Sequence, residues 1–391
     1  MDILSAHSPI KFGFPSLKLF SLPPSQPYKP VPRPPPATPS HVLANSLFQR
    51  ITIDPDLFYI SLDIKFVLTF TAIYVTTVLY LNQFNASRQY RPWRFTKTST
   101  FKALVVAHNA FLALFSAWTF CSLFTILLPL WDLAVAGAGP NYYAHVAELL
   151  CETDSSEYRG MISLIKMIIN VRTLNRLIMV ILLVLPISKS LWEAGGSYVG
   201  WLFYMSKFYE VVDTLVILAR GKKSSTLQTY HHAGVIICGW ATVLYESPLG
   251  AIGVVLNSAI HTLMYTYFTI QTLGISVPVG FKRTLTKLQL AQFFVGWIWG
   301  YTYLFMSYKV PVDVTAKRIN NGSTSALDPG KPHDSTPMPD IKTGVSTSES
   351  AVSCLSDSGE AFTIIVTSIY IIPLIYLFAQ FYIKAYLKQG K

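Results

Sequence analysis

Long apolar runs constrain this chain more than any other feature of its sequence. Seven are present, at residues 57–81, 103–130, 197–218, 233–247, 249–271, 288–308 and 361–386. A membrane-spanning helix needs roughly 20 apolar residues. Most runs reach that length, although Asp63 and Lys65 interrupt the first and the fourth is short unless its helix begins near Gln228. The runs therefore predict an all-α integral membrane protein with seven transmembrane helices.

Composition agrees with a membrane protein, because only 13% of the residues are charged. Soluble domains carry about twice that share, roughly 25%. Basic residues gather in alternate connections between the runs: Arg88, Arg91, Arg94, Lys97 and Lys102; Arg220, Lys222 and Lys223; Lys282, Arg283 and Lys287; Lys384, Lys388 and Lys391. By the positive-inside rule these segments are cytosolic, which predicts a lumenal or external N-terminus and a cytosolic C-terminus.

The net charge of +11 therefore does not call for nucleic acid as a partner. Two interpretations of the basic segments remain open. They either reflect topology alone or form a cationic rim for an anionic cytosolic ligand.

The remaining segments resemble tails and loops. Residues 1–56 hold half of the 24 prolines and predict a disordered lumenal tail. Residues 311–358, rich in Ser, Thr, Asp, Gly and Pro, predict a disordered lumenal loop. Between them, residues 57–310 form the predicted membrane core, and residues 359–391 hold the last helix and a basic cytosolic tail.

Two further features of the loops leave alternatives open. Cys151 and Cys354 both fall in predicted lumenal loops, so a disulfide between them is compatible with the sequence but not required by it. Residues 161–190 are apolar enough to suggest an eighth crossing, but that crossing would move the basic end of the next run into the lumen. We expect a non-spanning interfacial or re-entrant helix there, or translated intron sequence.

Ionisable residues inside the third run form a helical stripe. Lys207, Glu210 and Thr214 are spaced i, i+3 and i+7, with Asp213 beside them. Intramembrane ionisable residues are costly and usually functional. These side chains either pair with one another to hold the bundle together or line a polar cavity.

Histidines and amides mark the cytosolic start of the fourth run. Gln228 shares a helical face with His231 and His232, three and four residues away. In the fifth run, Asn257, His261 and Tyr265 follow one another at intervals of four residues, and Gln289 and Gln292 share a face of the sixth. The spacing predicts a two-histidine site formed by His231 and His261. Gln289 and Gln292 either belong to this site or form contacts between helices.

The adjacent histidines also suggest a metal site like that of membrane di-iron desaturases. Of eight histidines, only His108, His231, His232 and His261 lie near the predicted core, too few for such a site. We therefore expect neither a metal nor a cofactor. Imidazole can serve as nucleophile, base and acid in turn. In an apolar bundle beneath a basic rim it would meet a ligand with an anionic head and an apolar tail, as in an acyl-CoA thioester.

Four motifs now point to a family. Lys207 to Thr214 resembles KxxExxDT, Gln228 to His232 resembles HxxHH, Asn257 to Tyr265 resembles NSxxHxxMY, and Thr286 to Phe293 resembles TxLQxxQF. In this order they are specific to the ELO fatty acid elongases, the membrane 3-oxoacyl-CoA synthases. The resemblance covers roughly residues 57–310 and the last run. The sequence around His231 is similar to that of fungal members.

The resemblance implies an endoplasmic reticulum enzyme of very-long-chain fatty acid and sphingolipid synthesis. It would condense acyl-CoA with malonyl-CoA inside seven helices, six of which enclose an acyl tunnel open to the cytosol. Membrane lipid, other enzymes of the elongation cycle and a second copy of the chain are the expected partners. A seven-span transporter or receptor for an amphipathic anionic ligand is the alternative.

The resemblance also suggests a role for each candidate residue. His231 would attack the thioester to give an acyl-imidazole, while His261 or His232 orients malonyl-CoA or moves a proton. The substrate-binding candidates are Gln228, Lys207, Glu210, Asp213, Asn257, Tyr265, Gln289, Gln292, Lys222, Lys223, Arg283 and Lys287. Gln228 departs from the family motif, which has histidine there. Because an amide cannot carry a proton at neutral pH, a mechanism with three box imidazoles is excluded and a direct condensation remains open.

Overall fold

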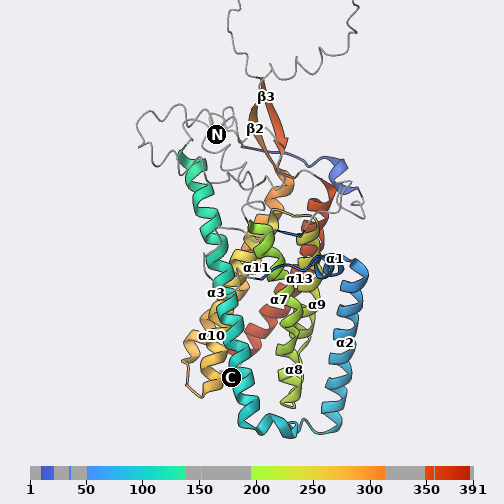
Figure 1. The fold of residues 1–391 in the computed structure, drawn as a ribbon, viewed down its shortest axis with the longest axis vertical. Coiled ribbons are helices and arrows are strands. Elements are labelled where there is room, and N and C mark those ends of the chain that lie inside the picture. Colours follow the sequence, from blue (N-terminus) through green and yellow to red (C-terminus); the bar gives the residue numbers. More distant parts are fainter. Residues whose placement is uncertain are drawn as a thin grey trace, which may run out of the picture.

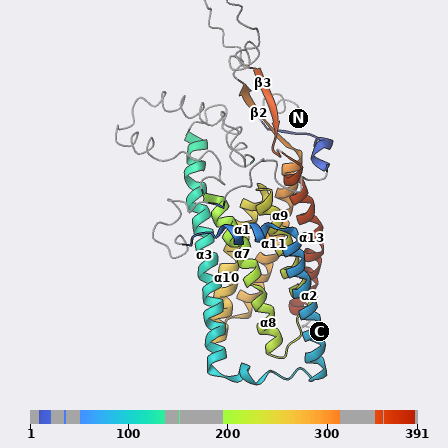
Figure 2. The ribbon, with the colours of Figure 1, turned by 45° about the vertical axis from the view of Figure 1, so that its right-hand side comes forward.

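The computed structural model describes residues 10–21, 35–36, 51–136, 151, 195–312, 348–355 and 357–387. The predicted non-spanning segment 161–190 lies outside them. Long helices form a bundle with a small sheet at one end (Figures 1 and 2). In chain order the helices are α1 (Pro55–Leu62), α2 (Ile64–Ser87), α3 (Ser99–Ala136), α7 (Ser197–Tyr209), α8 (Val211–Ala219), α9 (Thr226–Leu244), α10 (Leu249–Leu273), α11 (Val279–Phe305) and α13 (Ser358–Tyr382).

The prediction of a helical membrane protein is confirmed, with a correction to its class. Within the described residues, four helical segments are long and apolar enough to cross a membrane: Ile64–Ser87, Ser99–Leu128, Leu249–Leu273 and Ser358–Leu387. The other three predicted spans correspond to α7 with α8, α9 and α11, which pack in the same bundle. Three short strands are also present, so the chain is mostly helical rather than all-α.

Several helix boundaries differ from the apolar runs for local reasons. The first long helix begins at Ile64 rather than at residue 57, because the Asp63 carboxylate accepts a hydrogen bond from the backbone N–H of Lys65 (2.8 Å) and caps the helix. Asp63 and Lys65 therefore lie at the start of a span and do not interrupt one. The short fourth run gains the length it lacked, because α9 begins at Thr226, capped by Ser225.

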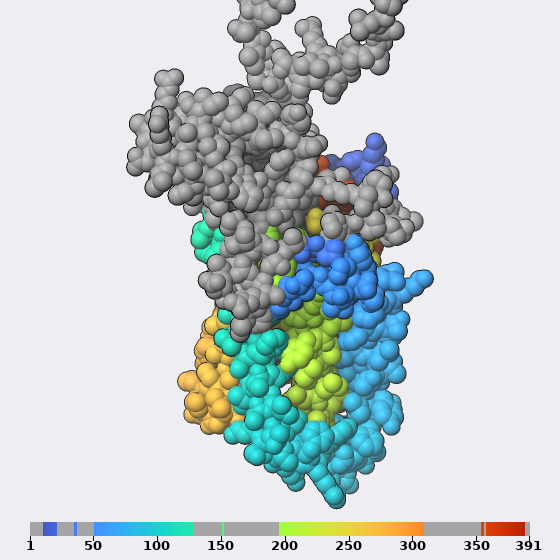
Figure 3. Space-filling model, in the orientation of Figure 1, coloured from blue at the N-terminus to red at the C-terminus, as the bar shows by residue number. Residues whose placement is uncertain are grey.

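Six of the helices close into a ring, and α2 lies outside it. Neighbours in the ring are α3 and α10, α10 and α11, α11 and α13, α13 and α9, α9 and α7, and α7 and α3. Helix α2 packs on α8 and α9 from outside. The space-filling view shows α8 between α2 and α3 on this face (Figure 3). The ring encloses the polar side chains of the predicted site.

A three-stranded antiparallel sheet covers one end of the bundle. Its order is β1 (Ile10–Phe12), β2 (Met306–Val312) and β3 (Ser348–Ser353). Parts of the predicted tail and loop thus pair as strands where the sequence predicted disorder, because β2 continues directly from α11 and supplies paired backbone groups to both neighbours. The disulfide that the sequence left open forms beside the sheet, between Cys151 and Cys354.

The opposite end is tied together by backbone and amide hydrogen bonds. Asn82 makes a reciprocal pair with the backbone of Ser224 (2.9 and 3.2 Å), and the buried Asn85 donates to the carbonyl of Leu218 (2.8 Å). Gly221, at φ 72°, lies against the chain after α2, where an added Cβ would be 2.4 Å from the carbonyl oxygen of Tyr90. These contacts hold the turn that leads into the histidine-bearing helix α9.

We expect Gly221→Ala to lower the Tm of the detergent-solubilised protein markedly. The left-handed backbone alone costs about 1–2 kcal/mol for a residue with a Cβ, and the backbone of Tyr90 cannot move aside as a flexible side chain would. Gly274→Ala is the matched control, because Gly274 also has a positive φ (96°) but its Cβ would meet no described atom within 4 Å. Equal shifts in Tm for the two variants would contradict the proposed clash.

Candidate active site

Two cavities inside the ring meet at the predicted nucleophile. The first, of about 450 Å³, contains most of the histidine and amide side chains, and the second, of about 160 Å³, has mainly apolar walls. His231, Gln292 and Phe293 line both. A ligand that reached from one cavity into the other would therefore pass the imidazole of His231.

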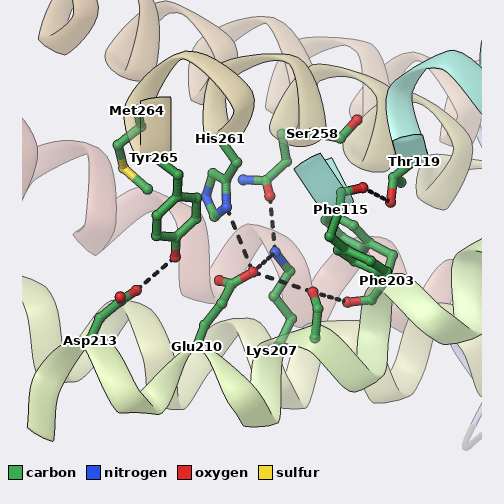
Figure 4. A network of polar contacts seen from close by, with 12 residues as sticks. Phe115, Thr119, Phe203, Lys207, Glu210, Asp213, Ser258, His261, Met264 and Tyr265 are labelled. Carbon is green, nitrogen blue, oxygen red and sulfur yellow. Dashed lines mark hydrogen bonds and ion pairs between the residues drawn. The ribbon is translucent and has the colours of Figure 1, made fainter. Parts of the chain in front are cut away.

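A buried ion pair joins Lys207 of α7 to Glu210, which lies between α7 and α8. The Lys207 ammonium lies 2.7 Å from Oε1 of Glu210, and both side chains are 2% exposed. Lys207 also donates to Oδ1 of Asn257 on α10 (3.2 Å). Figure 4 shows Lys207 and Glu210 facing the helix that carries His261 and Tyr265. Internal pairing therefore holds for Lys207, and the cavity that Lys207 lines is the second, mainly apolar one.

Glu210 also faces the imidazole of His261. Their closest atoms, Oε1 and Nδ1, are 3.6 Å apart, which is an electrostatic contact longer than a hydrogen bond. Within the described residues, Nδ1 of His261 and Oε2 of Glu210 have no hydrogen-bond partner. The pair can thus accept a further polar group from a ligand or water without breaking an existing bond.

Asp213 connects three helices on the wall of the first cavity. Its carboxylate accepts a hydrogen bond from the Tyr265 hydroxyl of α10 (2.6 Å) and contacts Nε2 of His108 on α3 (2.8 Å). The other ring nitrogen of His108 bonds the hydroxyl of Tyr209 (3.0 Å). Asp213 therefore has two defined partners, and both His108 and Tyr265 line the cavity with it.

The hydroxyl of Tyr370 on α13 contacts His231 at two atoms. The Tyr370 hydroxyl lies 2.8 Å from Nδ1 of His231 and 3.3 Å from the backbone carbonyl oxygen of the same residue. One hydroxyl hydrogen can serve only one of these, so both bonds form only if Nδ1 carries a proton and donates it while Tyr370 donates to the carbonyl. In this tautomer Nε2 keeps the lone pair that a nucleophile needs.

The second histidine of the box is held by the residue that replaces the family's leading histidine. The amide nitrogen of Gln228 lies 2.8 Å from Nε2 of His232 and 3.5 Å from the Thr214 hydroxyl. Thr214 in turn bonds the hydroxyl of Tyr74 (3.0 Å) on α2. Gln228 thus orients His232 by hydrogen bonding alone, as the sequence predicted for an amide.

The structure brings most of the predicted residues together but separates four cations from them. The first cavity is lined by Asp213, Gln228, His231, His232, His261, Tyr265, Gln289 and Gln292, and the second by Lys207, His231, Asn257 and Gln292. Glu210 lines neither of these two cavities. The four basic substrate-binding candidates, Lys222, Lys223, Arg283 and Lys287, are exposed and line none of the described cavities.

Other basic side chains line the cavities instead. Arg220 and Lys282 line the first cavity. A third cavity of about 880 Å³ contains Lys97, Lys102 and Arg220, and it shares Arg220, Gln271 and Thr272 with the first. Counting charges along the chain could not distinguish the basic residues that line a cavity from those that do not.

Sequence reasoning also missed His108 and Tyr370. The rule applied to the third run, that an ionisable residue inside a span marks function, would have identified His108 in the second. No signal of this kind existed for Tyr370, one of 22 tyrosines. Within the described part of the chain, no three His, Cys, Asp or Glu side chains form a group that could hold a metal ion.

Comparisons with known proteins agree on one family. The family model described as ELO, GNS1/SUR4 family, matches residues 59–391. Long chain fatty acid elongase 1 of Caenorhabditis elegans is 33% identical over 26% of this chain and 36% of its own length. Fatty acid elongase sre1 of Dictyostelium discoideum is 37% identical over 28% of this chain and 40% of its own. Very long chain fatty acid elongase 3 of Homo sapiens is 33% identical over 25% of this chain and 36% of its own.

The matched region thus spans well under half the length of these curated relatives. No solved structure matches the chain.

Proposed function

Since the chain belongs to the ELO (GNS1/SUR4) family, we propose that it is a very-long-chain fatty acid elongase. It would condense acyl-CoA with malonyl-CoA to give 3-oxoacyl-CoA, CO2 and CoA. The observation that carries this proposal is that the cavity holding the histidine and amide side chains meets a second, mainly apolar cavity at His231. A thioester carbonyl beside His231 would leave the CoA in the first cavity and the acyl chain in the second.

The reaction divides into two half-reactions at this imidazole. Nε2 of His231 attacks the acyl carbonyl carbon, the carbon–sulfur bond breaks, and CoA leaves as the thiolate or, after protonation, the thiol. Malonyl-CoA then loses CO2, and the resulting enolate carbon attacks the acyl-imidazole, which releases the ring nitrogen. Tyr370 supports the first step, because it keeps the proton on Nδ1 and thereby leaves Nε2 unprotonated.

The remaining polar groups would bind or position the second substrate. His261 and His232 are the candidates for orienting malonyl-CoA or moving a proton. Asn257, Tyr265 and Gln292 are the candidate donors to the developing oxyanions. Gln228 holds His232 without taking a proton, so a direct condensation in one step, without an acyl-imidazole, is the competing mechanism.

The CoA phosphates would bind at Lys97, Lys102 and Arg220, which line the third cavity, rather than at the four basic residues predicted from the sequence, which line none of the described cavities. The third cavity joins the first through Arg220, so a CoA whose thioester lies at His231 would extend toward these cations. Phosphate groups favour such clusters because each contact is charge-assisted. Lys282, on the wall of the first cavity, is a further candidate.

We expect the double variant Lys97→Gln and Lys102→Gln to raise the KM for malonyl-CoA about tenfold, equivalent to about 1.4 kcal/mol. Its kcat should change little, since neither lysine lies near His231. The wild-type KM should itself rise with salt, because partly exposed charges are screened. The matched control is Lys222→Gln with Lys223→Gln, which removes two exposed charges outside the cavities. An equal rise in KM in this control would contradict the assignment.

The two ends of the bundle support a location in the endoplasmic reticulum membrane with seven spans. The described basic segments lie at the end opposite the sheet, and the Cys151–Cys354 disulfide lies beside the sheet. Disulfides persist in oxidising compartments, and basic loops stay in the cytosol. The proposal therefore places the sheet and N-terminus in the lumen and the C-terminus in the cytosol, with six helices around the tunnel and α2 outside.

The deciding experiment measures carbon incorporation. Membranes that contain the expressed chain are supplied with acyl-CoA and isotopically labelled malonyl-CoA, and the 3-oxoacyl products are identified by mass spectrometry. A product two carbons longer than the primer, absent from membranes without the chain, supports the enzyme. Uptake or binding of acyl-CoA with no labelled product would instead favour the seven-span transporter or receptor. Similarity to fungal members, a homodimer and association with other elongation enzymes remain proposals beyond this test.

A further inference from the structure

Helices α10 and α11 run antiparallel beside each other, and their side chains meet near both ends. Near the sheet, an added Cβ on Gly300 would lie 2.7 Å from Cδ1 of Leu249. Toward the other end, the Gln289 amide lies 3.3 Å from the sulfur of Met264. One turn inward from the contact near the sheet are Gly253 on α10, four residues after Leu249, and Gly296 on α11, four residues before Gly300. Both glycines line the apolar cavity.

This glycine pair differs from two glycines of α9. A Cβ on Gly234 or Gly239 would lie 2.2 or 2.8 Å from the ring of a buried tyrosine, so those glycines permit close packing. A Cβ on Gly253 or Gly296 would meet no described atom within 4 Å. The missing side chains at this pair therefore leave space on the cavity wall instead of bringing two helices together.

Both glycines lie just beyond the reacting groups. One turn closer to the histidines, Asn257 on α10 and Gln292 on α11 also line the apolar cavity. An acyl chain whose carbonyl lay at His231 would extend past Asn257 and Gln292 and then between the two glycines.

We propose that Gly253 and Gly296 form a specificity-determining gap in the wall of the acyl tunnel. The inference rests on the proposed elongase function. It identifies the part of the tunnel wall that would limit the length of the acyl chain. Side chains at these two positions would project into space that the acyl chain occupies. A short primer would end before the gap, whereas a long primer must pass it.

The test compares primers of increasing length on Gly253→Leu and Gly296→Leu. Each purified full-length variant is assayed with a series of saturated acyl-CoAs and labelled malonyl-CoA. We expect kcat/KM for long primers to fall roughly tenfold or more, the size of effect that a misfit of a methylene group or more produces in an apolar pocket. The kcat/KM for the shortest primers accepted by the wild type should change little, because those primers end before the gap.

Gly280→Leu is the matched control. Gly280 lies on α11, its Cβ would also meet no described atom within 4 Å, and it lines none of the described cavities. Its primer profile should equal that of the wild type. If a leucine variant fails to fold, Gly253→Ala and Gly296→Ala carry the same test with a smaller side chain, and they should shift the profile in the same direction.

Two results would contradict the proposal that Gly253 and Gly296 form a specificity-determining gap. One is an unchanged primer profile in folded leucine variants, and the other is an equal loss for every primer length. Failure of the wild type to elongate any primer would count against the proposed function itself, so the two ideas fail in distinguishable ways.

Discussion

His231→Ala should abolish elongation, with a fall in kcat of about 10³-fold or more, as expected when a nucleophile is removed. The reason is specific to Nε2, the ring nitrogen that the contact with Tyr370 leaves unprotonated. His231→Gln should lose as much activity, although it keeps a hydrogen-bonding group of similar reach. The measurement is single-turnover labelling with radiolabelled acyl-CoA in the absence of malonyl-CoA, followed by mass spectrometry of the modified peptide.

Tyr370→Phe serves as the graded control for this prediction. It removes only the partner of Nδ1, so we expect a partial loss of roughly tenfold to a hundredfold, typical of lost orientation of a catalytic group. An acyl adduct that persisted in His231→Ala would refute His231 as the nucleophile. Full product formation by the wild type with no adduct under any condition would favour direct condensation.

Lys207→Met should cause the largest loss of stability that we expect of a single substitution. It leaves the carboxylate of Glu210 buried at 2% exposure without its closest partner. Breaking a buried ion pair from one side typically costs about 3–5 kcal/mol. The Tm of the detergent-solubilised protein should fall accordingly, and Glu210→Leu should destabilise for the mirrored reason, since it leaves the ammonium of Lys207 unpaired.

The double variant Lys207→Met with Glu210→Leu separates this explanation from simple loss of packing. With both charges removed, no buried charge is left uncompensated, so the double variant should lose less stability than the two single variants together. Its activity should stay low, because Lys207 also donates to Asn257 on the cavity wall. Additive losses of Tm would contradict the charge explanation and indicate that both side chains act through packing.

How far the sequence alone could lead differs between the parts of the site. His231, His232 and Gln228 fall within one turn of one helix, so helical spacing was enough to predict that they lie together. Gln292 and Asn257 belong to different helices, and their place on the wall of one cavity follows only from the packing of α10 on α11. The bond between Asp213 and His108 joins residues 105 positions apart, which no local period can indicate.

The same distinction between what the sequence predicts and what only the packing decides applies to the fold. Apolar length and the alternation of basic loops are properties of the chain in one dimension, so the sequence by itself determined a helical membrane protein and the residue types of its candidate site. Burial of Lys207, exposure of Lys222 and the pairing of β2 with strands from both the tail and the loop were decided only in the tertiary structure. The physical reason is that a cavity wall is formed by neighbours in space, and the side of a helix that faces a cavity depends on which other helices cover the remaining sides.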